Sequence, residues 1–108
     1  MPTTYKVLGQ SCPTSGSYVV LYQVPGATSA VCSTLAVANL GGTTAVRIAV
    51  QPASASLLPK HYIGYDLAVN QYDTLFLTLG VTLATTDVVA VYSGNSSASF
   101  NLFGSELT

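Results

Sequence analysis

The sequence predicts one all-β domain, a single antiparallel β-sandwich of about seven to eight short strands. Two observations predict it. Segments rich in Val, Ile, Thr, Tyr and Phe recur about every ten residues, and clusters of Gly, Pro, Asn and Ser separate them. No stretch sustains the apolar period of a helix. The spacing fits a jelly-roll-like or an immunoglobulin-like order, and periodicity does not choose between the two.

The first predicted strands flank a polar loop. Residues 4–10 (TYKVLGQ) and 18–24 (YVVLYQV) alternate in the manner of strands, and residues 11–17 between them are loop formers. Pro25 and Gly26 then form a strong turn dipeptide that ends the second strand.

Residues 31–51 (VCSTLAVANLGGTTAVRIAVQ) contain two strand-like arms around a glycine pair. Gly41 and Gly42 can adopt the positive φ of a tight turn, so we expect the arms to pair as a β-hairpin at the centre of the core. Strict alternation sets Leu35 and Cys32 on opposite faces of the first arm. In the second arm it sets Arg47 on the face opposite to that of Val46, Ile48 and Val50.

The second half begins with a linker at residues 52–59, because a proline at each end prevents either neighbouring strand from continuing. Alternation in the next predicted strand sets Tyr65 and Asp66 on opposite faces. The remaining strands are expected at residues 61–69, 74–79, 88–93 and 99–107, separated by turn residues.

Charge is scarce in this chain. Only 6% of its 108 residues are charged, against about 25% in a typical soluble domain, and the formal net charge is -1. So few cations cannot neutralise a run of phosphates, which argues against a nucleic-acid partner. Thirteen threonines and twelve serines supply surface polarity instead. We expect copies of the chain or a partner to cover much of the surface; a monomer with a hydroxyl-rich surface is the alternative.

Neither a membrane segment nor a disulfide framework is evident. No apolar run approaches the ~18 residues that span a bilayer, and the first residues lack the pattern of a signal peptide, so we expect synthesis in a cytoplasm and no membrane partner. Cys12 and Cys32 match no metal or redox motif. Free buried thiols are favoured, with one disulfide as the alternative.

Catalytic and metal-binding motifs are not found in the sequence. His61 is the single histidine, no nucleophile elbow is present, and no spacing of acidic residues matches a metal site. We therefore expect a protein that is not an enzyme and needs no cofactor or metal.

Contacts with other proteins are the expected chemistry. Tyrosine combines a large apolar ring with a hydroxyl and suits protein interfaces and sugar-stacking surfaces. Residues 1–17 are expected as an arm and loop of the single domain 1–108 that reaches a neighbour. The expected interface residues are exposed apolar or tyrosine side chains: Tyr5, Leu57, Leu58, Tyr62 and Tyr72.

Three motifs carry a resemblance to a known family. They are Tyr22-Gln23-Val24-Pro25-Gly26, Asn39-Leu40-Gly41 and Val46-Arg47-Ile48-Ala49-Val50, within segments 22–52, 60–69, 77–93 and 100–108. Together they resemble small virion structural proteins of tailed bacteriophages, which include capsid decoration (cement) proteins and proteins of tails or fibres. The motifs are turn and core features, and none is catalytic.

The resemblance implies a capsid decoration protein. Such a protein would sit on the outer surface of a phage head as a dimer or trimer and stabilise contacts between major capsid proteins. The alternative is a tail or fibre component with a receptor-binding or carbohydrate-binding role. A small enzyme or metal-binding domain is the least supported reading, because the chain has one histidine and no matching motif.

Overall fold

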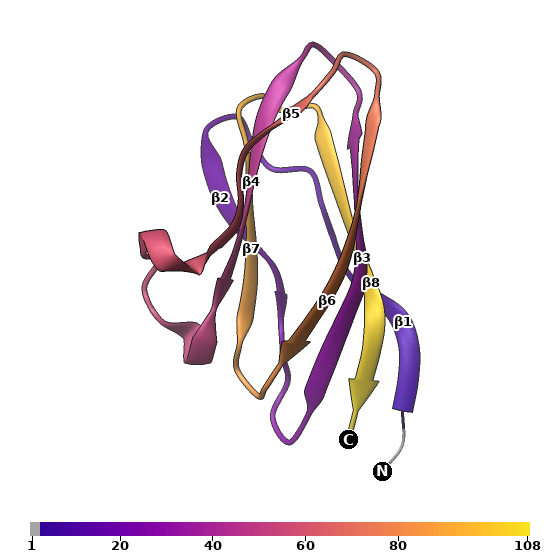
Figure 1. Ribbon diagram of the computed structural model, residues 1–108, viewed down its shortest axis with the longest axis vertical. Helices are drawn as coiled ribbons and strands as arrows, with labels where there is room; N and C mark the ends of the chain where they lie inside the picture. Colours follow the sequence, from indigo (N-terminus) through magenta and orange to yellow (C-terminus); the bar gives the residue numbers. More distant parts are fainter. Residues whose placement is uncertain (1–2) are drawn as a thin grey trace.

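The computed structural model describes residues 3–108, which form two four-stranded antiparallel sheets packed face to face (Figure 1). The first sheet has the order β1-β8-β3-β6 and the second the order β2-β7-β4-β5. The strands are β1 (Thr3–Ser11), β2 (Ser17–Gln23), β3 (Ser29–Asn39), β4 (Thr44–Gln51), β5 (Tyr62–Val69), β6 (Thr74–Leu83), β7 (Val88–Ser93) and β8 (Ala98–Leu107).

This strand order is that of an eight-stranded jelly roll. The predicted all-β sandwich is therefore confirmed, and of the two expected orders the jelly roll is the one observed. Most strand boundaries agree with the sequence to within one residue; the exceptions are β3, which begins two residues before the predicted start at Val31, and β6, which continues four residues past the predicted end at Leu79. No helix among the described residues is long and apolar enough to cross a membrane.

The predicted hairpin at residues 31–51 is wrong. β3 and β4 are indeed strands, but β3 pairs with β6 and β8 in the first sheet, whereas β4 pairs with β5 and β7 in the second. Both arms have a strongly apolar face, and each covers its own side of the core, so the chain crosses between layers where a hairpin was expected. Gly41 and Gly42 are not among the glycines with positive φ.

Side-chain contacts hold the chain in this crossing between the sheets. The Asn39 amide donates hydrogen bonds to the carbonyls of Gly42 (2.8 Å) and Val69 (3.1 Å), which ties the end of β3 to the second sheet. Gly41 lies close to Ser97, and a Cβ added there would approach the Ser97 hydroxyl oxygen to 2.8 Å. Gly41 is thus required for close approach and not for a left-handed conformation.

The core lies between the inner faces of the two sheets. Burying an apolar side chain of this size stabilises a fold by about 1.5–3 kcal/mol relative to leaving it exposed. The fully buried members include Leu35, Val37, Phe100 and Leu102 from the first sheet, and Val46, Ile48 and Val91 from the second.

An irregularity in β3 changes which side chains enter the core. The register with β8 shifts between Cys32 and Thr34, so Ser33 is an extra residue relative to that strand. Cys32 and Leu35 are consequently both buried, although strict alternation predicts opposite faces. Burial raises the pKa of the Cys32 thiol to about 11. Both cysteines are free, but only Cys32 is buried; Cys12 is exposed.

The N-terminal segment belongs to the sandwich. Within the expected arm at residues 1–17, residues 3–11 form β1, which pairs with β8 of the same chain. Met1 and Pro2 lie outside the described residues. Contact of this segment with a neighbouring molecule stays a prediction.

Candidate functional site

Aromatic and charged side chains gather on the outer face of the second sheet. The strand register places Tyr18 of β2 opposite Tyr92 of β7, and Tyr92 opposite Arg47 of β4. Tyr62, Tyr65 and Asp66 of β5 complete the group from the adjacent edge strand. We call these six residues the Tyr–Arg cluster.

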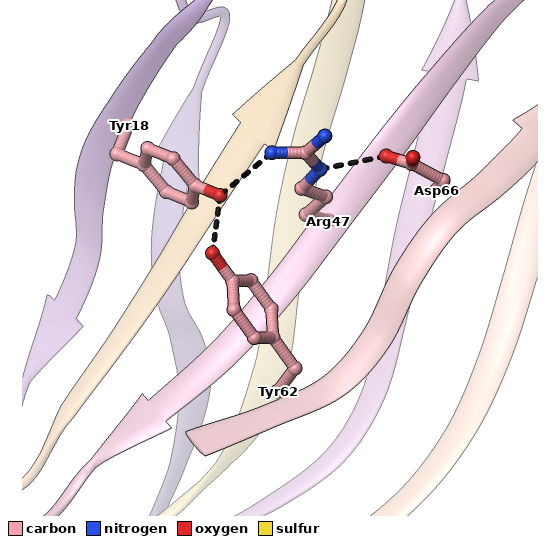
Figure 2. A network of polar contacts seen from close by, with 4 residues as sticks. All are labelled: Tyr18, Arg47, Tyr62 and Asp66. Carbon is pink, nitrogen blue, oxygen red and sulfur yellow. Dashed lines mark hydrogen bonds and ion pairs between the residues drawn. The ribbon is translucent and has the colours of Figure 1, made fainter. Parts of the chain in front are cut away.

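Arg47 is the centre of the cluster. Its guanidinium carbon lies 4.3 Å from the ring centroid of Tyr65 and 4.5 Å from that of Tyr92, so two aromatic faces enclose the cation. Its Nε donates to Asp66 Oδ1 at 2.6 Å, and its Nη1 donates to the Tyr18 hydroxyl at 3.1 Å (Figure 2). These two hydrogen bonds, the one to Asp66 first, raise the pKa of Arg47 above its ordinary value.

A bulge in β5 brings Tyr65 and Asp66 onto the same side of the sheet. The register shifts between Val46 opposite Leu67 and Ile48 opposite Gly64, which adds one residue to β5. Asp66 has φ 51°, a left-handed conformation that Asp tolerates better than most residues. The predicted placement of Tyr65 and Asp66 on opposite faces is therefore wrong, and both contact Arg47.

The tyrosines also fix one another. The hydroxyls of Tyr18 and Tyr62 share a hydrogen bond (Figure 2), and this bond is the largest cause of a rise in the pKa of Tyr62 to about 12. Ring centroids lie 4.8 Å apart for Tyr18 with Tyr92, and again for Tyr62 with Tyr65. A surface whose side chains already hold one another loses little conformational entropy when a ligand binds.

A shallow hollow of about 460 Å³ adjoins the cluster. Its lining comes from the connection between β4 and β5, which contains two short 3₁₀ turns, η1 (Pro52–Ser54) and η2 (Pro59–His61), and from the start of β5. His61 fixes this connection, because it is buried and its Nδ1 accepts a hydrogen bond from the Leu58 backbone N–H at 3.0 Å. The lining residues are Leu57, Leu58, Pro59, Tyr62 and Tyr65.

The structure brings together three of the five predicted interface residues. Leu57, Leu58 and Tyr62 line the same hollow, whereas Tyr5 lies on the outer face of the first sheet and Tyr72 in the turn between β5 and β6. That any of the five meets a partner stays a prediction.

Sequence reasoning missed the rest of the cluster, above all Arg47. One feature of the sequence points to it: Arg47 is the only arginine, and it stands in the middle of an apolar strand. A cation in that position needs a carboxylate or aromatic partner from a neighbouring strand.

The groups of the cluster are ones that can stack on a ligand or hydrogen-bond to it. The cluster offers ring faces, hydroxyls and a single carboxylate, and His61 is held in the connection beside it. Among residues 3–108, no three His, Cys, Asp or Glu side chains gather where they could hold a metal ion.

Comparisons with known proteins bear on the fold. No protein-family model matches the sequence, and no curated protein matches it. A chain in the structure of infectious bursal disease virus, Gx strain, is similar in fold to 97% of this chain, with a TM-score of 0.52 and 8% sequence identity. The match spans 31% of that viral chain, so this chain corresponds to about a third of it.

Proposed function

We propose that this chain is a structural protein of a virion, and specifically a capsid decoration protein on the outer surface of a phage head. The observation that carries the proposal is the jelly-roll fold, which spans the described chain and is shared with a chain in a virus structure. The sequence motifs that resemble virion proteins of tailed phages support the phage assignment.

The mechanism would be additive burial of surface. A decoration protein binds neighbouring copies of the major capsid protein and thereby resists their separation. A contact of about 800 Å² per partner is modest, but many copies on a regular lattice convert modest affinity into strong avidity. Scarce charge, and short connections between most of the strands in residues 3–108, suit a protein that works by contact alone.

The partners in this proposal are the major capsid protein and further copies of the chain. Nucleic acid, membrane and cofactors have no part in it. Synthesis in the host cytoplasm followed by attachment to assembled heads is the route that this role requires.

Quantitative mass spectrometry of purified virions tests the proposal. A copy number comparable to that of the major capsid protein would support decoration, and the purified chain should then bind expanded capsids and raise their heat resistance. A handful of copies would contradict decoration and favour a tail or fibre. Absence from virions would overturn a virion role altogether.

A second candidate function is favoured by the Tyr–Arg cluster and its hollow. In a tail or fibre component, this surface would bind a carbohydrate receptor, because exposed tyrosine rings stack on sugars and the adjacent hydroxyls and the Asp66 carboxylate can hydrogen-bond to them. Tyr65 is 55% exposed at the edge of the hollow.

Titration of host polysaccharide into the chain tests this alternative. Tyr65→Ala should abolish binding, whereas Tyr72→Ala should not, since Tyr72 is also exposed but lies outside the cluster. Equal binding by both variants, or none by the wild type, would exclude the cluster as a sugar site.

A further inference from the structure

The outer face of the first sheet carries no charged side chain. Its register places Val7, Phe103, Thr34 and Thr78 in one row across β1, β8, β3 and β6. A neighbouring row runs from Tyr5 through Ser105 and Val31 to Thr82, and another from Gln10 through Asn101 and Ala36 to Phe76. None of these three rows contains Lys, Arg, Asp, Glu or His.

The charged residues that lie within the strands of this sheet, Lys6 of β1 and Glu106 of β8, have side chains that point away from this face. Lys6 and Glu106 pair with each other at 3.0 Å, and Glu106 accepts a hydrogen bond from Tyr22 of the second sheet. Both side chains are therefore turned toward the space between the sheets. The outer face of the second sheet differs, because it carries Arg47 and Asp66.

Large apolar groups on the charge-free face are exposed. Phe76 is 69% exposed and Tyr5 is 83% exposed, and Val7 and Phe103 also count among the exposed large side chains. They come from β1, β8 and β6, so they spread across the width of the sheet. Exposed aromatic groups distributed over a charge-free face are typical of a surface that another protein covers.

The polar groups of the face suit a second copy of the same face. Thr, Ser, Asn, Gln and Tyr each carry both a donor and an acceptor, so such a side chain can hydrogen-bond to its own symmetry mate. Lys or Glu could not, because like groups would repel across a two-fold axis. The Gln10 amide already donates to Asn101 at 2.7 Å within the face, which leaves further capacity on both amides.

The face is also large enough. β8 has ten residues, which gives a length of about 34 Å at ~3.4 Å per residue, and four strands at ~4.8 Å give a width of about 19 Å. The accessible area of a surface with projecting side chains exceeds this flat projection. Overlap of two such faces therefore approaches the ~800 Å² per partner of a standard interface.

We propose that the outer faces of two β1-β8-β3-β6 sheets pack against each other, so that the chain is a two-fold symmetric dimer joined through this face. The contact buries Phe76 and Phe103 of each copy and leaves the Tyr–Arg cluster of both copies facing outward. This dimer gives a specific form to the self-association that the proposed function includes. The dimer rests on the proposed function only for its role in the virion.

Sedimentation velocity of the purified chain, at concentrations up to about 100 μM, tests the dimer. Phe76→Asp should weaken self-association by about 100-fold or more, because it buries two unpaired carboxylates in a charge-free contact. Thr78→Asp, in the middle row of the same face, should act in the same direction and guards against a folding defect particular to Phe76→Asp. Circular dichroism checks that both variants are folded.

Val20→Asp is the matched control. Val20 is 60% exposed on β2, which is an edge strand of the second sheet just as β6 is an edge strand of the first. Dimers in the wild type and in Val20→Asp, with monomers in Phe76→Asp and Thr78→Asp, would establish the face.

Other outcomes would overturn the assignment. A wild-type monomer at all concentrations, a trimer, or a dimer broken by Val20→Asp and not by Phe76→Asp each excludes a two-fold contact through this sheet. These results come from the isolated chain, so they are independent of the copy number in virions, which decides the proposed function.

Discussion

Glu106 joins the two sheets at the end of the sandwich where β1 begins and β8 ends (Figure 1). It accepts a hydrogen bond from the buried Tyr22 of β2 and pairs with Lys6 of β1. The Tyr22 hydrogen bond, and after it Lys6, lower the pKa of Glu106. Burial first, and then the Glu106 carboxylate, raise the pKa of Tyr22.

Tyr22→Phe should therefore destabilise the fold in a pH-dependent way. At pH 7 we expect a loss of about 1–2 kcal/mol in the free energy of unfolding, since a hydrogen bond to a charged group disappears. The folded pKa of Glu106 lies below its unfolded value of about 4.3, so its contribution is present above that pH and is lost as the pH falls through the folded pKa.

Urea denaturation at pH 7 and at pH 3 measures this effect. The difference between wild type and Tyr22→Phe should shrink at pH 3, while Tyr72→Phe, at an exposed position in the turn between β5 and β6, should match the wild type at both values. A difference that stays constant with pH would show that the charge of Glu106 plays no part.

Arg47 organises its tyrosine neighbours, so Arg47→Lys should loosen them. Lysine keeps the charge, but it lacks the planar fork that contacts Asp66 and Tyr18 while lying between two rings. We expect a weaker tyrosine signal in near-ultraviolet circular dichroism, with the far-ultraviolet spectrum unchanged. Lys60→Arg serves as the control, and an unaltered tyrosine signal in Arg47→Lys would refute this role.

At the scale of elements, the bulge in β5 shapes the Tyr–Arg cluster. Because Asp66 takes a left-handed conformation, Tyr65 and Asp66 reach Arg47 from successive positions. The bulge also sits on an edge strand, where such irregularities discourage pairing with a foreign strand.

Substitutions at Asp66 should separate the backbone effect from the charge effect. Asp66→Asn removes the ion pair with Arg47 but tolerates positive φ, whereas Asp66→Val removes the ion pair and also strains the backbone by a further ~1–2 kcal/mol. Urea denaturation of both variants gives this difference directly. Equal stabilities would mean that the left-handed conformation is not retained.

The strands could be predicted from the sequence, but the partner strands to which most of them are hydrogen-bonded could not. Alternation is a local property, so it predicts β7 at its observed ends. A turn such as Gly41-Gly42 shows that the chain changes direction, but it does not show which sheet the next strand joins. The bulges at Ser33 and Asp66 have no sequence signature, yet each moves the following side chains to the other face.

The candidate site was only partly predictable for the same reason. Leu57, Leu58 and Tyr62 are close in sequence, and the sequence alone indicates them as surface candidates; in the structure they line one hollow. Tyr18, Arg47 and Tyr92 meet only through the register of three strands that are remote in the chain. Without the strand order, their proximity cannot be inferred.

At the scale of the whole molecule, the two halves of the chain are interleaved. In both sheets, strands of the first half (β1 to β4) alternate with strands of the second half (β5 to β8), so every paired neighbour comes from the opposite half. Neither half can build a sheet alone. Folding must therefore wait for long-range pairing, which predicts slow folding compared with proteins rich in local contacts.

Limited trypsin digestion tests this interleaving. The chain has three basic cleavage positions: Lys6 lies within β1, Arg47 is held in β4 by its cluster, and Lys60 is exposed in the connection between the halves. The first cut should follow Lys60.

Because every strand of fragment 1–60 pairs only with strands of fragment 61–108, the nicked chain should elute as one folded particle in native buffer and separate into two peptides in denaturant. Lys60→Gln should resist this first cut. Fragments that part in native buffer and each remain folded would contradict the observed pairing, because each would then have to hold its own strands together.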